Sequence, residues 1–254
     1  MPLTFIFFPH PSSSNSQHCH TKNDWKGISG EIPKCITRLP FLRTLDLIGN
    51  QISGGIPYDI GRLNRLAVLN VADNRISGSI PKSLTNLSSL MHLDLRNNLI
   101  SGVIPPDVGR LKMLSPDVDL SGNQLYGTIP PSLGRMSVLA TLNLDGNKIS
   151  GEIPQTLMTS SVMNLNLSRN LLQGKIPEGF GPRSYFTVLD LSYNNLKGPI
   201  PRSISGASFI GHLDLSHNHL CGRIPVGSPF DHLEAASFMF NDCLCEISTF
   251  KTIY

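Results

Sequence analysis

Apolar residues along the chain follow a short alternation that returns about every 24 residues. Each return begins with two apolar residues separated by one polar position, such as Leu45 and Leu47. Alternation with a period of two is typical of a short β-strand with one buried face. A second apolar pair three residues apart, such as Ile60 and Leu63, favours a short helical or 3-10 turn. The chain is therefore predicted to repeat one strand–turn unit many times.

One string, N-x-[LI]-x-G-x-I-P, recurs after the strand in eight successive units. Successive asparagines lie 24, 24, 25, 24, 23, 24 and 24 residues apart, and they number the coils one to eight. An asparagine amide offers both donors and acceptors, so in a sharp turn it satisfies backbone groups of its own coil and of the next. Loss of one such side chain would leave buried backbone groups unpaired, at about 1–3 kcal/mol. The expected structural ladder consists of Asn50, Asn74, Asn98, Asn123, Asn147, Asn170, Asn194 and Asn218.

The repeat predicts an α/β solenoid with a parallel sheet on its concave face and short helical or 3-10 turns on its convex side. Residues 1–23 are an irregular N-terminal segment, residues 24–225 hold a half repeat and eight repeats, and residues 226–254 form a C-terminal cap and a divergent tail. Pro116 precedes the strand of coil four, and proline cannot donate to a strand ladder. We therefore expect that strand to be shortened or distorted.

The G-x-I-P element resembles that of the plant extracellular subclass of leucine-rich-repeat proteins, which includes polygalacturonase-inhibiting proteins and the ectodomains of receptor kinases. A closer resemblance is to the plant protein family named for DNA-damage repair and toleration. It covers about residues 24–245 and rests on the stretches DWKGISGEIPKCI, SLTNLSSLMHLDLRNN, FGPRSYFTVLDLS and GHLDLSHNHLCGRIPVGSPFDHLEAASF. The resemblance implies a right-handed superhelix and a secreted or cell-wall protein that binds other proteins.

The two ends of the chain depart from the pattern of the resembled families. Those families carry a cysteine-paired N-terminal cap and one further C-terminal cysteine, and neither is visible here. A truncated or rearranged relative is therefore expected. At the C-terminus, four apolar side chains are expected to cover the last coil: Phe230, Leu233, Phe238 and Phe240. At the N-terminus, the first coil is either open or covered irregularly by residues 5–8.

Five cysteines make an odd count for a secreted protein. Cys19 and Cys35 could pair, and so could two of the three cysteines Cys221, Cys243 and Cys245, which leaves one thiol free. The apolar run over residues 3–8 has no preceding basic residue and ends at a proline, so it is not a convincing signal peptide.

Composition and motifs exclude several function classes. Charged residues make up 15% of the chain and the net charge is +3 without a basic stripe, which argues against a nucleic-acid partner. No apolar stretch approaches the roughly 18 residues needed to cross a bilayer. Neither a G-x-x-x-x-G-K-[ST] loop nor a G-x-S-x-G elbow occurs, and His18, Cys19 and His20 lack a second ligand pair for a metal. We therefore predict no enzyme, no cofactor and no metal.

The exposed positions of the strands form the concave face, which is the usual binding surface of a solenoid. Seven gaps of about 4.8 Å give a face roughly 35 Å long, enough for a protein partner or a protein associated with cell-wall polysaccharide. The chain itself is expected to be a monomer. The central column of this face reads Asp46, Asn70, Asp94, Asp119, Asn143, Asn166, Asp190 and Asp214. Five carboxylates could suit a basic partner, but the repeat consensus explains them better.

Residues that break the repeat pattern on this face are the candidate partner-binding residues, because arginine and tyrosine dominate interface hot spots. They are His92, Arg96, Asp145, Arg169, Tyr193, His212 and His217. Two N-x-S sequons occur: Asn86 lies on the convex side, whereas Asn166 lies on the concave strand and is the weaker glycosylation candidate.

A protein-binding scaffold of the plant cell wall or apoplast, in recognition or defence, is the favoured function. The alternatives are a DNA-damage-toleration factor, as the resembled family's name suggests, and a truncated nonfunctional relative.

Overall fold

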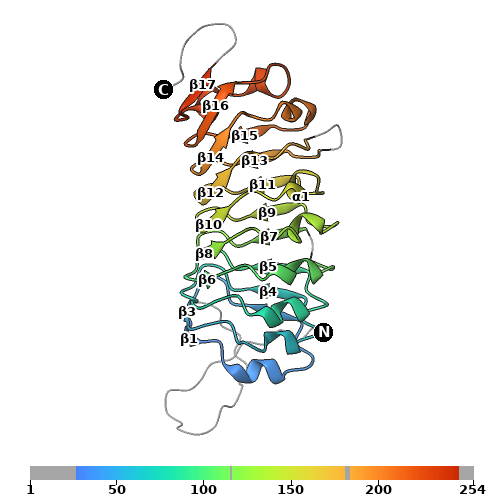
Figure 1. Ribbon diagram of the computed structural model, residues 1–254. Coiled ribbons are helices and arrows are strands. Elements are labelled where there is room, and N and C mark those ends of the chain that lie inside the picture. Colours follow the sequence, from blue (N-terminus) through green and yellow to red (C-terminus); the bar gives the residue numbers. More distant parts are fainter. Residues whose placement is uncertain (1–26, 115, 181–183, 246–254) are drawn as a thin grey trace.

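The computed structural model describes residues 27–114, 116–180 and 184–245. Over these residues the chain winds through successive coils that stack into one elongated body (Figure 1). Each coil lays a short strand beside the strand of the coil before it, and all pairings are parallel. The predicted leucine-rich-repeat solenoid is confirmed, because the α-helix and 3-10 helices are only short turns between sheet strands.

Two long parallel sheets run along the body, one more than the sequence predicted. The eight-stranded sheet forms the concave face in the order β15-β13-β11-β9-β7-β5-β4-β2. Its strands are β2 (Thr44–Asp46), β4 (Val68–Asn70), β5 (His92–Asp94), β7 (Asp117–Asp119), β9 (Thr141–Asn143), β11 (Asn164–Asn166), β13 (Val188–Asp190) and β15 (His212–Asp214).

The second sheet has seven strands in the order β17-β16-β14-β12-β10-β8-β6, and β1 and β3 form a separate pair. Most of these strands come from the segment that begins after the ladder asparagine of a repeat and ends at or near its glycine, and coil two has only isolated bridges there. They are β1 (Ser29–Glu31), β3 (Gln51–Ser53), β6 (Ser101–Gly102), β8 (Gln124–Gly127), β10 (Lys148–Gly151), β12 (Leu171–Gly174), β14 (Asn195–Gly198), β16 (His219–Arg223) and β17 (Cys243–Cys245).

Short helical turns lie on the convex side, where the Ile-Pro pair of most repeats leads into them. Buried apolar residues of these turns and of both sheets form one continuous core along the stack. The turns are η1 (Lys34–Arg38), η2 (Ile60–Arg62), η3 (Lys82–Asn86), η4 (Pro106–Arg110), η5 (Leu133–Arg135), α1 (Gln155–Met158), η6 (Arg202–Gly206), η7 (Phe230–His232) and η8 (Ala235–Phe238).

The asparagine ladder closes the bend between the two sheets. Asn147 illustrates it: its Nδ2 donates to the carbonyls of Leu144 (3.0 Å) and Asp145 (3.2 Å) in its own coil and of Leu120 (3.0 Å) in the coil before. Its Oδ1 accepts the backbone N–H of Leu125 at 3.0 Å. The ladder asparagine therefore bonds to the coil before its own, and not to the coil after it as the sequence analysis expected. Asn147 thus satisfies four backbone groups that are buried or half-buried, and Asn50, in the first coil, satisfies three.

A ninth rung, which the sequence did not predict, lies in the C-terminal cap. Asn241 Nδ2 donates to the carbonyls of Leu215 and Phe238, both at 3.0 Å, and its Oδ1 accepts from the N–H of Leu220 at 2.9 Å. The cap is therefore a partial ninth coil, and its strand β17 extends the second sheet.

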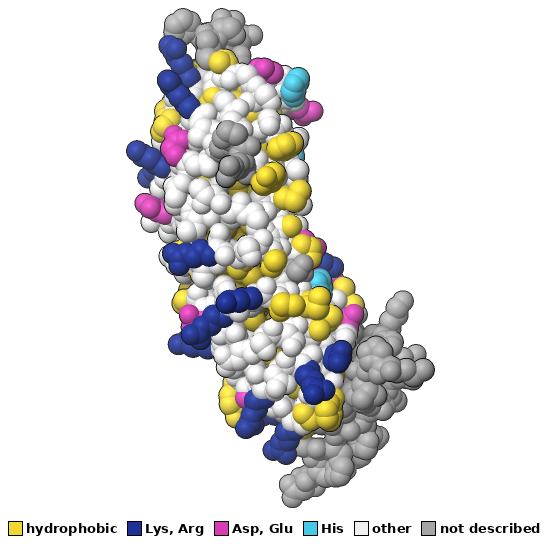
Figure 2. Space-filling model, turned by 90° about the vertical axis from the view of Figure 1, so that its right-hand side faces the viewer, with side chains coloured by type: hydrophobic (Ala, Val, Ile, Leu, Met, Phe, Trp, Pro, Cys, Tyr) yellow, Lys and Arg dark blue, Asp and Glu magenta, His cyan; other side chains and the backbone are white. Residues whose placement is uncertain are grey.

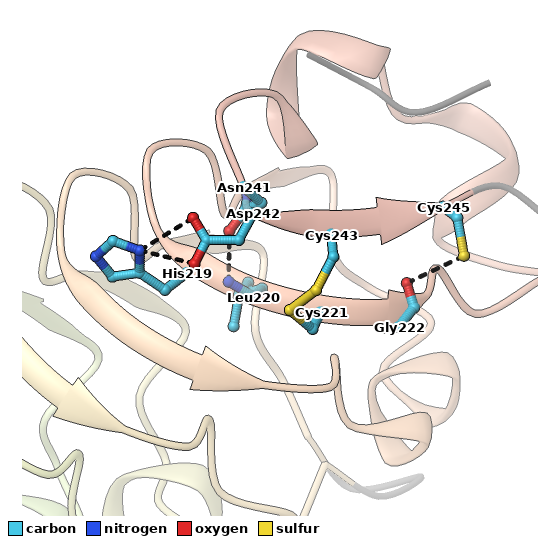
Figure 3. Close-up of a disulfide and its surroundings, with 8 residues drawn as sticks. All are labelled: His219, Leu220, Cys221, Gly222, Asn241, Asp242, Cys243 and Cys245. Atoms are coloured by element: carbon cyan, nitrogen blue, oxygen red, sulfur yellow. Dashed lines mark hydrogen bonds and ion pairs between the residues drawn. A yellow bond between two sulfur atoms is a disulfide. The ribbon is translucent and has the colours of Figure 1, made fainter.

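The expected roles of the cap side chains hold for Phe230 and Phe238, which are buried in the core. The expectation for Phe240 was wrong, because this side chain is 56% exposed. Phe240 precedes the ladder asparagine, where the backbone turns the side chain outward, and Leu244 fills the core instead. The disulfide Cys221–Cys243 joins the last two strands of the second sheet, and Cys245 is a free thiol (Figure 3).

Two other expectations concern places where the chain departs from its repeat. The strand after Pro116, β7, keeps three residues, so it is not shortened. Only its pairing with β5 is affected, with two residue pairs where the other pairings of the eight-stranded sheet have three. The apolar run over residues 3–8, the site at His18 to His20 and Cys19 lie outside the described residues. Cys35 is buried in η1.

Candidate partner-binding face

The side chains of the central Asp/Asn column on the concave face make the same local hydrogen bond in each coil. In every coil the side-chain Oδ1 accepts the backbone N–H of the residue two positions on, as Asp190 does from Ser192 at 3.0 Å. Asn143 makes the same bond with Asp145 at 3.2 Å, so the bond needs an oxygen acceptor and not a charge. The repeat consensus therefore explains these residues, as the sequence analysis favoured.

The position just before each ladder asparagine has a left-handed backbone. Coils one, four and five place glycine there, with φ of 71°, 60° and 64°. Within the described residues, all six non-glycine residues with positive φ occupy this same position, with φ between 50° and 58°. They are Asp73, Asn97, Arg169, Tyr193, His217 and Phe240. A left-handed backbone costs an ordinary L-residue about 1–2 kcal/mol, and glycine avoids most of that cost.

Four of these residues stack into one continuous row, which we call the ledge: Arg169, Tyr193, His217 and Phe240. The Arg169 guanidinium lies 5.3 Å from the centroid of the Tyr193 ring. The Tyr193 and His217 rings stack at 3.9 Å with an interplanar angle of 13°, and those of His217 and Phe240 at 4.2 Å and 18°. Asp145 extends the row, because its carboxylate lies 3.5 Å from Arg169 Nη1. The structure thus brings four of the seven predicted candidates, Asp145, Arg169, Tyr193 and His217, into contact.

A second polar cluster lies in coils two and three, around Arg96. Its guanidinium contacts Asp94 at 2.8 Å and Asp73 at 3.9 Å, and Asn97 donates to Asp73 at 2.7 Å. Burial raises the pKa of Asp94 above its ordinary value, against the lowering effect of the backbone N–H and the guanidinium of Arg96. Glycines at the left-handed position of coils four and five separate this cluster from the ledge.

Of the remaining candidates, His92 lies beside the Arg96 cluster and His212 joins neither group. His92 begins strand β5 and is half-buried near Asp94, whereas His212 begins β15 and is exposed. Phe240 is a member of the ledge that sequence reasoning assigned to the core. The spacing of 23 residues between Asn218 and Asn241 was the signal that could have identified it.

The two sequons differ sharply in accessibility. Asn86 ends η3 on the convex side, and both Asn86 and Ser88 are exposed. Asn166 instead uses Oδ1 to accept the N–H of Ser168 at 3.0 Å and its hydroxyl at 2.6 Å, and Ser168 is completely buried.

Residues 27–114, 116–180 and 184–245 hold neither a cluster of metal ligands nor a membrane-spanning helix. Across that part of the chain, no three His, Cys, Asp or Glu side chains gather in a way that would hold a metal ion. No helix among the same residues is long and apolar enough to span a bilayer.

Comparisons with known proteins agree with this architecture. Two family models, both described as leucine-rich repeat, match residues 64–125 and 160–220, and residues 41–63, 117–136 and 138–159. A curated relative, the DNA damage-repair/toleration protein DRT100 of Arabidopsis thaliana, is 72% identical over 29 residues, which are 11% of this chain and 8% of that protein.

Solved structures with the same architecture include plant receptor ectodomains. The Arabidopsis receptor kinase HAESA, in complex with the peptide hormone IDA and the co-receptor SERK1, has a TM-score of 0.81 and 34% identity over 89% of this chain and 38% of that chain. The plant peptide hormone receptor RGFR1 in complex with RGF2 gives 0.73 and 33%, over 87% and 34%.

A plant ice-binding protein also matches, with a TM-score of 0.70 and 28% identity over 87% of this chain and 78% of that chain. Of the two receptor chains, HAESA and RGFR1, this chain covers 38% and 34%, so it spans only about a third of their length. Domains of this type are protein-interaction folds and, in general, are not catalytic. The repeat string, the asparagine ladder and the matches over residues 41–136 and 138–220 place the chain in the leucine-rich-repeat family.

Proposed function

We propose that the chain is a non-catalytic scaffold that binds a protein partner through its concave face, in recognition or defence at the plant cell wall or apoplast. The ledge is the observation that supports this proposal. A left-handed backbone position that glycine fills at lowest cost instead holds arginine, tyrosine, histidine and phenylalanine in four successive coils. Strained positions that persist are a reason to infer a function for their side chains.

The chemistry of the ledge suits a protein partner. Tyr193 is 46% exposed and Phe240 is 56% exposed, so a partner that covers them buries apolar ring surface. Because the rings stack on one another, they are held in place before binding and lose little conformational entropy. The receptor ectodomains with this architecture were solved with a peptide hormone, or with a peptide hormone and a co-receptor, which supports a protein or peptide partner.

A pull-down from plant cell-wall extract tests this proposal. The bait is the immobilised full chain, compared with an Arg96→Ala/Tyr193→Ala variant and with a matched Arg75→Ala/Tyr126→Ala variant. Arg75 and Tyr126 are exposed and lie on the second-sheet side. We expect the concave variant to lose a partner that the wild type and the second-sheet variant both retain. Equal recovery by all three proteins would contradict the role of the concave face, and no partner for the wild type would favour a nonfunctional relative.

The alternative of a DNA-damage-toleration factor rests on the name of a relative that matches over 29 residues. A DNA-stimulated ATPase assay separates the two functions. We expect no turnover with single-stranded or double-stranded DNA, and measurable turnover would overturn the assignment as a non-catalytic scaffold.

A further inference from the structure

A second surface of unusual composition lies on the flank where each helical turn leads into the next concave strand. We call it the connector flank, and define it as residues 38–43, 62–67, 86–91, 110–114, 116, 135–140, 158–163, 184–187 and 206–211. It is separate from the ledge, which follows the strands rather than precedes them.

Exposed apolar side chains concentrate on the connector flank. Of the sixteen exposed large apolar side chains in the described part of the chain, seven lie on this flank. They are Phe41, Met91, Met113, Val138, Met163, Tyr185 and Phe209, between 41% and 59% exposed. Each belongs to a different coil. In coil two, where none occurs, the Arg65 guanidinium lies 5.0 Å from the centroid of the Phe41 ring and keeps the row continuous.

The charge of the connector flank has one sign. Its described residues carry seven exposed cations and no carboxylate: Arg38, Arg43, Arg62, Arg65, Arg110, Lys112 and Arg135. All seven belong to coils one to five. Only two have a carboxylate partner in the adjoining turn, Arg62 with Asp59 at 3.3 Å and Arg110 with Asp107 at 4.0 Å. Figure 2 shows this side of the molecule, with yellow side chains along it and dark blue ones among them in the lower half.

These two properties together identify the kind of partner. A polyanion such as an acidic polysaccharide would gain from the cations but nothing from Phe41, Met91 or Met113. A second copy that docked through the same flank would place seven cations against seven cations, which costs free energy. A protein surface that presents carboxylates among apolar side chains satisfies both the charge and the exposed apolar area.

We propose that the connector flank of coils one to five docks an acidic protein surface. This second partner is additional to the one on the concave face, so the scaffold holds two proteins on different sides. Attraction between the cations and the carboxylates steers the encounter, and burial of the methionine and phenylalanine side chains holds the complex.

Defined peptides test this inference on the full chain. The probe is a fluorescent peptide of about ten alternating Glu and Leu residues, long enough to span five coils. Its matched controls are a Glu–Ser peptide with the same charge and a Lys–Leu peptide with the opposite charge. We expect the Glu–Leu peptide to bind at least about tenfold more tightly than both controls in fluorescence anisotropy, and to weaken as salt rises.

Variants locate the site. Arg65→Glu/Lys112→Glu and Met91→Ser/Met113→Ser are each expected to weaken Glu–Leu binding about tenfold or more, whereas Tyr193→Ala/His217→Ala leaves it unchanged. Circular dichroism and thermal unfolding check that each variant is folded, which is expected because the altered side chains are exposed.

Several results would overturn the inference. Equally tight binding of the Glu–Ser peptide or of polygalacturonate would show a surface for polyanions. Self-association of the wild type that the connector variants abolish would show that a second copy occupies it. No saturable binding, or loss of binding only in the Tyr193/His217 variant, would show that the flank is not a docking surface. Because the concave pull-down uses other variants, the two proposals can fail separately.

Discussion

Replacing Tyr193 separates the two roles that a ledge residue plays. Its backbone is left-handed, with φ of 53°, and its ring contacts His217 and Arg169. Tyr193→Ala removes the ring and keeps a Cβ at the left-handed position. Tyr193→Gly removes the ring and also the steric cost of the Cβ. The two variants lose the same contacts, so any difference in their stability reports the backbone alone.

The magnitudes follow from the geometry. A stacked ring pair contributes about 0.5–1.5 kcal/mol and an exposed cation–π contact about 0.5–1 kcal/mol. Because the Tyr193 side chain is 46% exposed, we take the lower values and expect Tyr193→Ala to lower the free energy of unfolding by about 1 kcal/mol. Glycine relieves about 1–2 kcal/mol of left-handed strain but loses about 0.5–1 kcal/mol through its more flexible unfolded state. Tyr193→Gly should therefore be close to the wild type in stability.

Urea unfolding followed by far-UV circular dichroism measures this order. We expect the wild type and Tyr193→Gly to unfold at similar urea concentrations and Tyr193→Ala to unfold earlier. The same pair of substitutions at Tyr126, in strand β8, is the control, because its backbone is not left-handed and glycine should there be the less stable. If Tyr193→Gly is no more stable than Tyr193→Ala, the strain reasoning is refuted. Both Tyr193 variants should lose the concave-face partner equally.

Three further predictions concern the ladder, the buried carboxylate and the sequons. Asn123→Ala should lower the free energy of unfolding by about 3 kcal/mol or more, because it leaves four buried backbone groups without a hydrogen-bond partner. Urea unfolding measures this loss, and a change below about 1 kcal/mol would contradict the ladder's role. Asp94→Asn should raise the melting temperature at neutral pH, because burial raises the pKa of Asp94 and disfavours its charged form. That gain should shrink as the pH falls through the raised pKa and the wild-type carboxyl takes up its proton, whereas a loss at neutral pH would show that the Arg96 ion pair outweighs burial. In a secretory expression host, Asn86→Gln should abolish a glycosidase-sensitive shift on a gel and Asn166→Gln should not, because Ser168 is buried; the reverse pattern would contradict this.

The sequence predicted the fold well because each coil repeats the same physical requirements. Buried leucines, a ladder amide and a glycine with positive φ recur at fixed spacing, and the structure uses them in the same way in each coil. The second sheet was not predicted, because its strands are two to five residues long and carry turn-forming glycines. Such segments are too short for a period-two pattern to stand out.

The ledge could be predicted only in part, because contacts between coils join residues about 24 positions apart. Arg169, Tyr193 and His217 were recognised as departures from the repeat, but nothing in a single coil indicates that their side chains stack. Phe240 was missed because its coil lacks the G-x-I-P string, so its position before Asn241 was hidden. His92 and His212 were also selected as departures from the repeat, and the structure gives them no shared site.

Site-specific photocrosslinking tests the central claim, a partner on the concave ledge, most directly. A benzoylphenylalanine in place of Tyr193 reports contacts of the ledge, and the same group in place of Tyr126 reports contacts of the second sheet. Tyr126 is the more exposed of the two, at 54% against 46% for Tyr193, so it is a stringent control. After irradiation in cell-wall extract, we predict a crosslinked protein band from position 193 and none from position 126. A band from position 126 alone, equal bands from both positions, or no band from position 193 would contradict the account.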